Sequence, residues 1–377
     1  MSTPVGQLPR WVDYGLLPLV NLAAAFLVSG VVVLLIGENP IDAVRTLVYG
    51  ALGYGEGFGF TLFYATDFVL TGLAVAVAFH AGLFNIGGEG QATLGGLGVA
   101  LVCLPLGGML PWWALLPIAL VAAAAFGAGW AFIPAWLQAK RGSHVVITTI
   151  MFNFIASALL VYLLVDVLSY GSMQPETRSF GDAAQLPLAR DWFNPDLIDF
   201  GQSPLNLATV VAALAVVGVW VLIWRTRLGY EIRTFGLNPT AAGYAGISPV
   251  KITLVAMLIS GALAGLMSIN EVMGASNRLI IGFTSGYGFV GIAVALMGRG
   301  HPVGIVLAAL LFGILYQGGA ELAFETPGIT RDMIVVIQGL VILFAGGLEH
   351  MFRPALARIF APRPKVARPT AAPGASA

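Results

Sequence analysis

The sequence predicts an all-α, polytopic membrane protein with about ten transmembrane helices and both termini in the cytoplasm. Hydrophobic residues make up 58% of the 377 positions and charged residues only 10%, far from the balance of a soluble domain. The mean hydropathy is +0.89. Apolar runs long enough to cross a bilayer recur along the chain. Cys103 is the single cysteine and lies in an apolar run, so neither a disulfide framework nor a metal site is expected.

The first crossing is predicted at Leu17–Ile36. These twenty residues carry no charge and would cover about 30 Å as a helix. Residues 1–16 lack the pattern of a removed signal peptide, so the first crossing is expected to remain as a membrane anchor. The charge distribution described below assigns these residues to a cytoplasmic N-terminus. A hydrophilic connection is expected at Gly37–Gly57. It leads into a second crossing, Phe58–Phe79, with Asp67 near its middle.

The stretch Phe79–Gly96 differs most from the apolar composition expected of a lipid-facing segment. It places Asn85, Glu89 and Gln91 among six glycines, between two long apolar runs. Such polar groups at membrane depth must face protein, a polar pathway or water. Two interpretations stay open: a break that lines or gates a path, or a cytoplasmic hairpin with a few polar residues.

Eight further crossings complete the predicted set of ten. They are Ala92–Gly107, Pro111–Leu137, Val145–Val165, Leu205–Trp224, Ile252–Met273, Tyr287–Met297, Pro302–Gly319 and Met333–Gly347. Several of these are short or interrupted by glycine, notably Tyr287–Met297, so a re-entrant pair is also possible.

The distribution of basic residues predicts the orientation. With a cytoplasmic N-terminus, thirteen of the 18 Lys and Arg residues fall on the inner side, most of them within 140–141, 225–251 and 353–368. This bias is the one that fixes membrane topology, and it is consistent with an even number of crossings. Residues 348–377 are rich in Pro, Ala and Arg, and are expected to form a disordered cytoplasmic tail.

Two connections are too long to be simple turns. The outer one, residues 166–204, is acidic and contains aromatic residues, among them Tyr170, Phe180, Trp192 and Phe193, which favours partial order and slightly favours docking of an external partner over a passive lid. The inner one, residues 225–251, contains a helix start at Asn238-Pro239: an Asn cap followed by a Pro whose missing N–H costs nothing there. A short helix over Thr240–Ala245, stopped by Gly246, is predicted to lie across the cytoplasmic face. It either meets a partner surface or packs only on its own membrane helices.

The chain is not expected to hydrolyse ATP. A P-loop needs Gly-Lys followed by Ser or Thr, and none of Lys140, Lys251 and Lys365 is followed by either residue. The string Gly286–Gly291 satisfies G-x-G-x-x-G but lies in an apolar run, so it is interpreted as close helix packing, as is the spacing of Gly261 and Gly265.

Four segments carry a family resemblance. The run Gly82-Leu-Phe-Asn-Ile-Gly-Gly-Glu-Gly-Gln91 resembles the signature of permease subunits of ATP-binding cassette (ABC) importers, in the branch serving branched-chain amino acids, simple sugars and nucleosides. Three weaker matches follow in the expected order, at Thr148–Asn153, Arg233–Ile247 and Gly286–Pro302. The chain looks most like the larger permease of nucleoside and simple-sugar transporters. It departs from many relatives at His144-Val145 and Thr234.

The resemblance implies a permease domain over residues 17–347 in a multi-pass protein of the bacterial plasma (inner) membrane. It implies four kinds of partner: a cytoplasmic ABC ATPase subunit that uses the ATP, a second and probably different permease chain, an extracytoplasmic binding protein, and membrane lipid. No cofactor of its own and no nucleic acid are expected. It also implies that the inner loop couples to the ATPase through Arg233, Gly236, Asn238, Pro239, Ala241, Ala242 and Gly246.

A nucleoside or related sugar-containing solute is the predicted cargo. The hypothesis places it in a path lined by Asn85, Glu89, Gln91, Asn153 and Asn270, because amides pair with base edges and ribose hydroxyls. The alternative is a secondary transporter driven by protons or sodium that uses Asp67, Glu89 and Glu271. A membrane enzyme is disfavoured, since no catalytic constellation can be defended.

Overall fold

The structure is a computed structural model that describes residues 9, 12–171, 173–326, 328–343, 354 and 356. These residues form fourteen α-helices with short π and 3-10 segments between some of them. The helices are α1 (Leu17–Ile36), α2 (Pro40–Leu52), α3 (Gly55–His80), α4 (Gly88–Leu106), α5 (Trp112–Arg141), α6 (Val145–Tyr162), α7 (Ala189–Trp192), α8 (Ala208–Arg225), α9 (Arg227–Leu237), α10 (Pro239–Tyr244), α11 (Pro249–Ser268), α12 (Tyr287–Met297), α13 (Pro302–Glu325) and α14 (Arg331–Ile342). The π segments Leu163–Val167 and Ile269–Ala275 extend α6 and α11.

Each of the ten predicted crossings corresponds to a helix, and the all-α membrane fold is confirmed. In the described part of the chain, eight helices are long and apolar enough to span a bilayer. The two exceptions are α12 and α14. With eleven residues α12 is about 16 Å long, roughly half the hydrocarbon thickness. The predicted Met333–Gly347 crossing overlaps α14, but its last residues lie outside the described part, as does nearly all of the predicted 348–377 tail.

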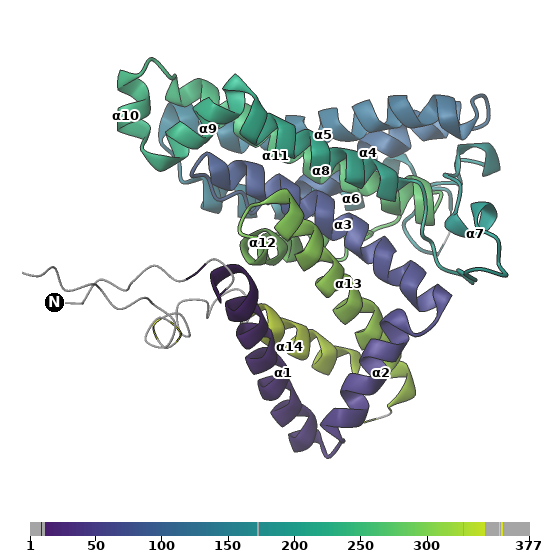
Figure 1. The fold of residues 1–377 in the computed structure, drawn as a ribbon. Helices are drawn as coiled ribbons and strands as arrows, with labels where there is room; N and C mark the ends of the chain where they lie inside the picture. Colours follow the sequence, from purple (N-terminus) through teal and green to yellow (C-terminus); the bar gives the residue numbers. More distant parts are fainter. Residues whose placement is uncertain are drawn as a thin grey trace, which may run out of the picture.

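The helices fall into a large bundle and a smaller lobe (Figure 1). The bundle contains α3 to α6 and α8 to α11, while α1, α2 and α14 form the lobe at the far end of α13. Helix α3 lies at the centre: 83% of the residues in its most apolar part are buried, and Phe68, Leu70 and Leu73 are fully covered. In α5, α6 and α8 only 22% of the corresponding residues are buried. These three helices expose large apolar side chains, as lipid-facing helices do.

Glycines allow the central helices to approach closely. A Cβ atom added to Gly95 of α4 would lie 2.6 Å from Gly265 Cα of α11, and one on Gly127 of α5 would clash with Gly261 O. The predicted packing role of Gly261 and Gly265 is therefore confirmed. The predicted packing role of the Gly286–Gly291 string is confirmed as well, because a Cβ on Gly291 would lie 2.6 Å from Thr71.

The expected hydrophilic connection at Gly37–Gly57 is wrong, because most of it forms α2. Asn39 caps this helix by accepting a hydrogen bond from the Ile41 N–H at 3.0 Å, and Pro40 follows the cap. Ala43, Leu47, Gly50 and Ala51 recur at helical spacing and are buried. A Cβ on Gly50 would lie 2.5 Å from the Glu321 side chain, so this face of α2 packs closely on α13. The segment is an amphipathic helix whose charged residues lie on the outer face, and those charges led to the wrong prediction.

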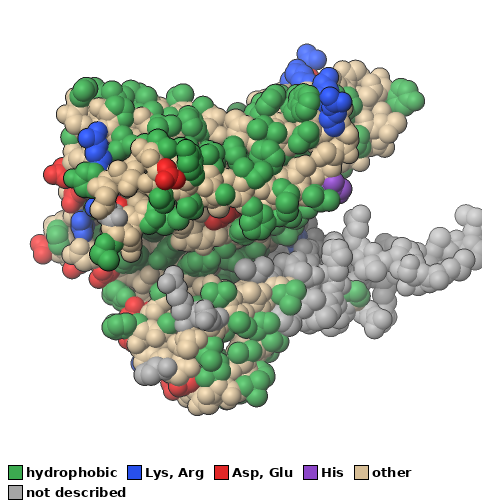
Figure 2. All heavy atoms as spheres, turned by 180° about the vertical axis from the view of Figure 1, so that it is seen from behind, with side chains coloured by type: hydrophobic (Ala, Val, Ile, Leu, Met, Phe, Trp, Pro, Cys, Tyr) green, Lys and Arg blue, Asp and Glu red, His purple; other side chains and the backbone are tan. Residues whose placement is uncertain are grey.

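Charged side chains gather at the two ends of the bundle (Figure 2). A group of Lys and Arg side chains lies at the α9–α10 end, and the opposite end carries acidic side chains together with a few Lys or Arg side chains. The surface between the two ends is mainly apolar or neutral. This arrangement agrees with a bundle that crosses the membrane along its length, with the α9–α10 end in the cytoplasm. The orientation itself stays a prediction.

Candidate functional site

The chain reverses between α3 and α4 over residues 81–87, a segment called the break below. The N–H groups of Ala81, Gly82 and Leu83 donate to carbonyls of the last turn of α3 at 2.9–3.0 Å, and Gly82 adopts a left-handed φ of +69°. A tight reversal is therefore present, and both interpretations of the glycine-rich stretch, a break that lines a path or a cytoplasmic hairpin, remain compatible with it. Gly88 and Gly90 are buried, so the N-terminus of α4 is covered by the rest of the bundle.

The side chain of Asn85 fixes the geometry of the break. Its Nδ2 donates to Gln91 Oε1 at 2.9 Å, and Gln91 Nε2 donates back to Asn85 Oδ1 at 3.1 Å. Asn85 Nδ2 also donates to Ser260 Oγ of α11 at 2.8 Å, and Ser260 in turn donates to Ala74 O of α3 at 2.6 Å. All three polar side chains are at most 1% exposed. The network joins three helices to the break, and its buried groups are satisfied inside the protein.

Two further buried amides tie neighbouring helices to this region. Asn153 of α6 accepts from the Gly90 N–H and donates to Ile86 O, both at 2.9 Å. Asn270 donates to a carbonyl of α3 at 3.2 Å and accepts from Asn206 at 2.9 Å. The structure thus brings Asn85, Gln91 and Asn153 together, whereas Asn270 belongs to a separate set of contacts. Their role in lining a path stays a prediction.

The half-buried carboxylate of Glu89 caps the N-terminus of α12. Its Oε1 accepts from Thr284 Oγ1 at 2.6 Å and from the Gly286 N–H at 3.0 Å, and its Oε2 accepts from the Gly288 N–H at 2.9 Å. A carboxylate is stabilised there by the positive end of the helix dipole. A Cβ on Gly288 would lie 2.6 Å from Glu89 Cα, so the two helix N-termini, α4 and α12, touch inside the bundle.

A cavity of about 470 Å³ opens next to the start of α12. The described residues that line it are Tyr64, Ser285, Tyr287, Tyr316, Ala320, Ala323, Ile334, Val335 and Gln338. They come from α3, the segment before α12, α12, α13 and α14. This volume lies within the range of small-molecule sites.

Three tyrosines form one wall of the cavity. The ring centroids of Tyr64, Tyr287 and Tyr316 lie 5.8–6.2 Å apart in tilted or edge-to-face pairs. Behind them the fully buried Phe68 contacts Tyr287 at 5.5 Å and Tyr316 at 4.9 Å, so the rings are held from the protein side. Sequence analysis missed this cluster. The only signal was the presence of tyrosines inside apolar runs, where a hydroxyl group needs a hydrogen-bond partner or a polar cavity.

The acidic residues of the ion-coupled alternative lie in two places. Asp67 is fully buried in α3, beside the side chains of Asn270 and Glu271. Glu89 instead caps α12, as described above. The structure therefore brings Asp67 and Glu271 together and leaves Glu89 in its own set of hydrogen bonds.

The inner loop forms two helices, α9 and α10. The predicted short helix is confirmed to within one residue as Pro239–Tyr244, capped by Asn238, which accepts from the Ala241 N–H at 3.0 Å. Helix α9 was not predicted, because its few apolar residues are dispersed among charged ones. Ala242 is the buried residue of α10, while Leu237 and Tyr244 are 88% and 91% exposed.

The other predicted coupling residues also have definite places. Arg233 and Gly236 lie in α9, Pro239 and Ala241 in the first turn of α10, and Gly246 follows α10 with a left-handed φ of +80°. Gly236 packs directly on the break: a Cβ there would clash with His80 O and would lie 2.9 Å from Gly82 N. The inner loop and the break are thus in backbone contact.

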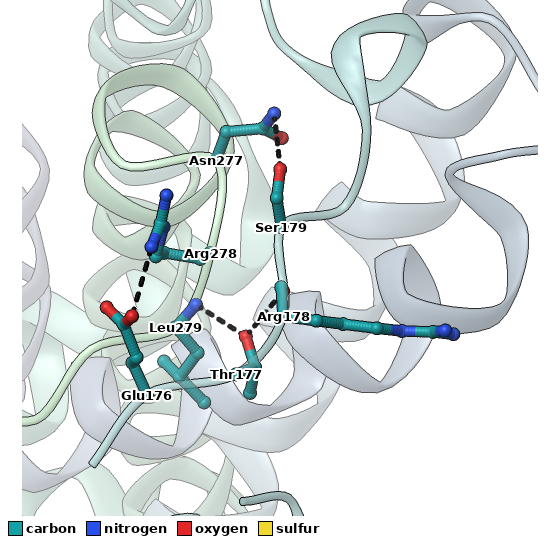
Figure 3. Close-up of polar contacts among 7 residues, drawn as sticks. All are labelled: Glu176, Thr177, Arg178, Ser179, Asn277, Arg278 and Leu279. Atoms are coloured by element: carbon teal, nitrogen blue, oxygen red, sulfur yellow. Dashed lines mark hydrogen bonds and ion pairs between the residues drawn. The ribbon is translucent and has the colours of Figure 1, made fainter. Parts of the chain in front are cut away.

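The outer loop is ordered in part and packs on the segment that precedes α12 (Figure 3). The N–H of Thr177 donates to Leu279 O and the N–H of Leu279 donates to Thr177 Oγ1, both at 3.0 Å. Arg278 Nη1 and Glu176 Oε1 form an ion pair at 3.0 Å. The partial order expected for residues 166–204 is present, and docking of an external partner stays a prediction.

Comparison with known proteins adds a family to this geometry. Residues 57–346 match the model of the family described as the permease component of branched-chain amino acid transport systems. The match covers α3 to α14 and so includes the break, the cavity and the inner loop.

Three relatives are similar over nearly their whole length. The glucose ABC transporter permease protein of Haloferax volcanii is 38% identical, over 90% of this chain and 89% of its own. The guanosine ABC transporter permease protein of Bacillus subtilis is 37% identical, over 87% and 92%. The nucleoside ABC transporter permease protein of Lactococcus lactis subsp. cremoris is 33% identical, over 87% and 90%.

Proposed function

This chain belongs to the family of branched-chain amino acid transport system permease components, and from that premise we propose that it carries a nucleoside or related sugar-containing solute. It is a permease subunit of an ABC importer and a multi-pass protein of the plasma (inner) membrane. We propose that transport is driven when a cytoplasmic ATPase, the only partner that uses ATP, displaces α10.

The single observation that carries the coupling proposal is the contact between α9 and the break. Gly236 meets backbone atoms of His80 and Gly82, and no flexible side chain separates them. The break ends at Gly87, and α4 begins at Gly88, next to Glu89. A displacement of α9 and α10 therefore moves the break, because closely packed backbone segments have little free space between them and shift together.

The exposed surface formed by α10 and the end of α9 fits a protein partner. Leu237, the last residue of α9, and Tyr244, the last residue of α10, are large apolar residues that the chain leaves almost fully exposed. They belong to the two helices at the end of the molecule where Lys and Arg gather (Figure 2). Exposed aromatic and aliphatic side chains beside charge are typical anchors of an interface. This favours seating on an ATPase over a connector that packs only on its own helices.

The cargo proposal is supported by the relatives and by the groups that the site offers. The similar permeases are described for guanosine, nucleosides and glucose, all of which are uncharged. In this chain Asn85, Gln91, Asn153 and Asn270 are neutral, and the charge of Glu89 is stabilised by the N-terminus of α12. We propose that these five residues frame the path, with Glu89 nearest to the cavity.

Two further partners complete the proposal: a second permease chain beside this one in the membrane and an extracytoplasmic binding protein. The outer loop, packed on the segment that leads into α12, is the surface proposed for the binding protein (Figure 3).

The experiment compares Leu237→Ala/Tyr244→Ala with Leu197→Ala/Tyr170→Ala. Leu197 and Tyr170 are 82% and 70% exposed in the outer loop, so the control removes the same side chains at the other end. The first variant is expected to lose co-purification with the ATPase subunit and ATP-dependent uptake, while the control keeps co-purification. Equal co-purification of both variants would contradict coupling through α10.

The ion-coupled alternative is tested in the same vesicles. Uptake that survives ATP depletion and follows a proton or sodium gradient would favour it, and would direct attention to Asp67 and Glu271.

A further inference from the structure

We propose that the tyrosine-lined cavity binds the flat heterocyclic base of a nucleoside during its passage, and that Glu89 positions the wall of this site. The inference rests on the proposed function and makes it more specific, since it selects nucleosides over simple sugars and names the residues that hold the base.

The aromatic wall is suited to a planar ring. Tyr64 and Tyr316 are partly exposed and line the cavity, whereas Tyr287 is 6% exposed and Phe68 is fully buried behind it. The rings are therefore supported from one side and accessible from the other. Stacking of a base on an aromatic side chain contributes about 1–3 kcal/mol by alanine substitution, and every base has a flat face to offer.

The rest of the lining also fits an uncharged nucleoside. None of the nine described lining residues carries a charge. A charged solute would therefore lose its hydration in the cavity and find no opposite charge there, which costs free energy. Ala320, Ala323, Ile334 and Val335 supply the apolar part of the lining. Ser285, Gln338 and the tyrosine hydroxyls can pair with a base edge or with ribose hydroxyls.

Glu89 acts on the cavity through the segment before α12. Ser285 and Gly286 have left-handed φ angles of +45° and +80°, a conformation that costs free energy at Ser285 and needs support from its surroundings. The Glu89 carboxylate provides that support, because it accepts from Thr284, Gly286 and Gly288 on both sides of Ser285. These bonds set the positions of Ser285 and Tyr287 in the wall. Glu89 is therefore a positioning residue.

The test is site-specific labelling of an engineered cysteine in the assembled complex. Cys103, the native cysteine, is fully buried and contributes little background. Ala320 is an exposed lining residue, so Ala320→Cys is expected to react with a methanethiosulfonate reagent. Guanosine is expected to slow this labelling at least tenfold, and glucose to leave it unchanged. Met109→Cys, 78% exposed in the connection between α4 and α5 and outside both the cavity and the outer loop, is the matched control whose labelling no solute should change.

Two further variants separate contact from positioning. Tyr316→Ala is expected to raise the guanosine concentration that gives half-protection about tenfold, and Tyr316→Phe by much less, because the ring face is kept. Glu89→Gln is expected to raise it several-fold, while the labelling rate without solute stays the same. A merely structural role for Glu89 would instead change the rate without solute.

The outcomes distinguish failure of the inference from failure of the proposed function. Protection by glucose but not by guanosine, or guanosine protection unchanged in Tyr316→Ala, would overturn the inference. If ATP-dependent uptake of guanosine persists in that case, the proposed function stands and the solute passes elsewhere. A complex without any ATP-dependent uptake would instead contradict the proposed function itself.

Discussion

Replacing Gly236 by alanine should uncouple ATP hydrolysis from transport. The new Cβ would clash with His80 O and would lie 2.9 Å from Gly82 N and 3.0 Å from Ala81 C. Ordinary Cβ contacts lie at 3.4–4 Å, so α9 must move away from the break by about 0.5 Å or more. All three neighbouring atoms belong to the backbone, so no side-chain rotation can relieve the overlap.

The magnitude follows from two opposing effects. Alanine favours a helix over glycine by about 1 kcal/mol, and overpacking costs about 1–3 kcal/mol. If the net cost of 1–2 kcal/mol weakens the contact between α9 and the break, transport falls about 5- to 30-fold. The overall fold should persist, because the clash is limited to one contact.

The assay measures ATP hydrolysis and uptake in the same reconstituted vesicles. Gly218→Ala is the matched control: Gly218 lies in α8, away from the proposed ATPase surface, and a Cβ there would meet nothing within 4 Å. We expect Gly236→Ala to keep ATP hydrolysis with uptake lowered about 5- to 30-fold, and Gly218→Ala to keep both. Wild-type uptake per ATP in Gly236→Ala would refute the mechanical link between the inner loop and the break.

Two other predictions concern contacts that hold the site. Asn85→Ala should lower the free energy of unfolding by about 1–3 kcal/mol, seen as a lower melting temperature in detergent, because buried groups of Gln91 and Ser260 lose their partner; an unchanged melting temperature would contradict the network. Glu176→Gln should change stability by less than about 1 kcal/mol, since its ion pair with the 41%-exposed Arg278 is partly solvated. A larger loss would mean that the outer loop contributes to the core.

Local patterns in the sequence were sufficient for much of the fold. Polar caps followed by proline mark the starts of four helices, at Asn39-Pro40, Asn238-Pro239, Ser248-Pro249 and His301-Pro302. Three of these lay in or beside segments interpreted correctly. The first was overlooked because the charged face of α2 outweighed the regular spacing of its apolar residues.

The candidate site was only half accessible from the sequence. The glycine-rich stretch indicated an interruption between two helices, and the structure has a reversal over residues 81–87 that contains Asn85, with Glu89 and Gln91 in the first turn of α4. The sequence did not show that the first and last of these pair with each other, since a single chain does not say which amide faces which. The cavity tyrosines could not be predicted as a group, because Tyr64 and Tyr316 are more than 250 positions apart in the sequence and meet only through helix packing.

ATP-dependent uptake by the complete complex tests the central claim most directly. Vesicles would contain this chain, its candidate permease partner, the ATPase and the binding protein, and would be offered labelled guanosine, glucose and a branched-chain amino acid in turn. We predict that guanosine accumulates only with ATP, and that Gly236→Ala lowers this accumulation about 5- to 30-fold. Uptake that persists without ATP and follows an ion gradient would contradict the account.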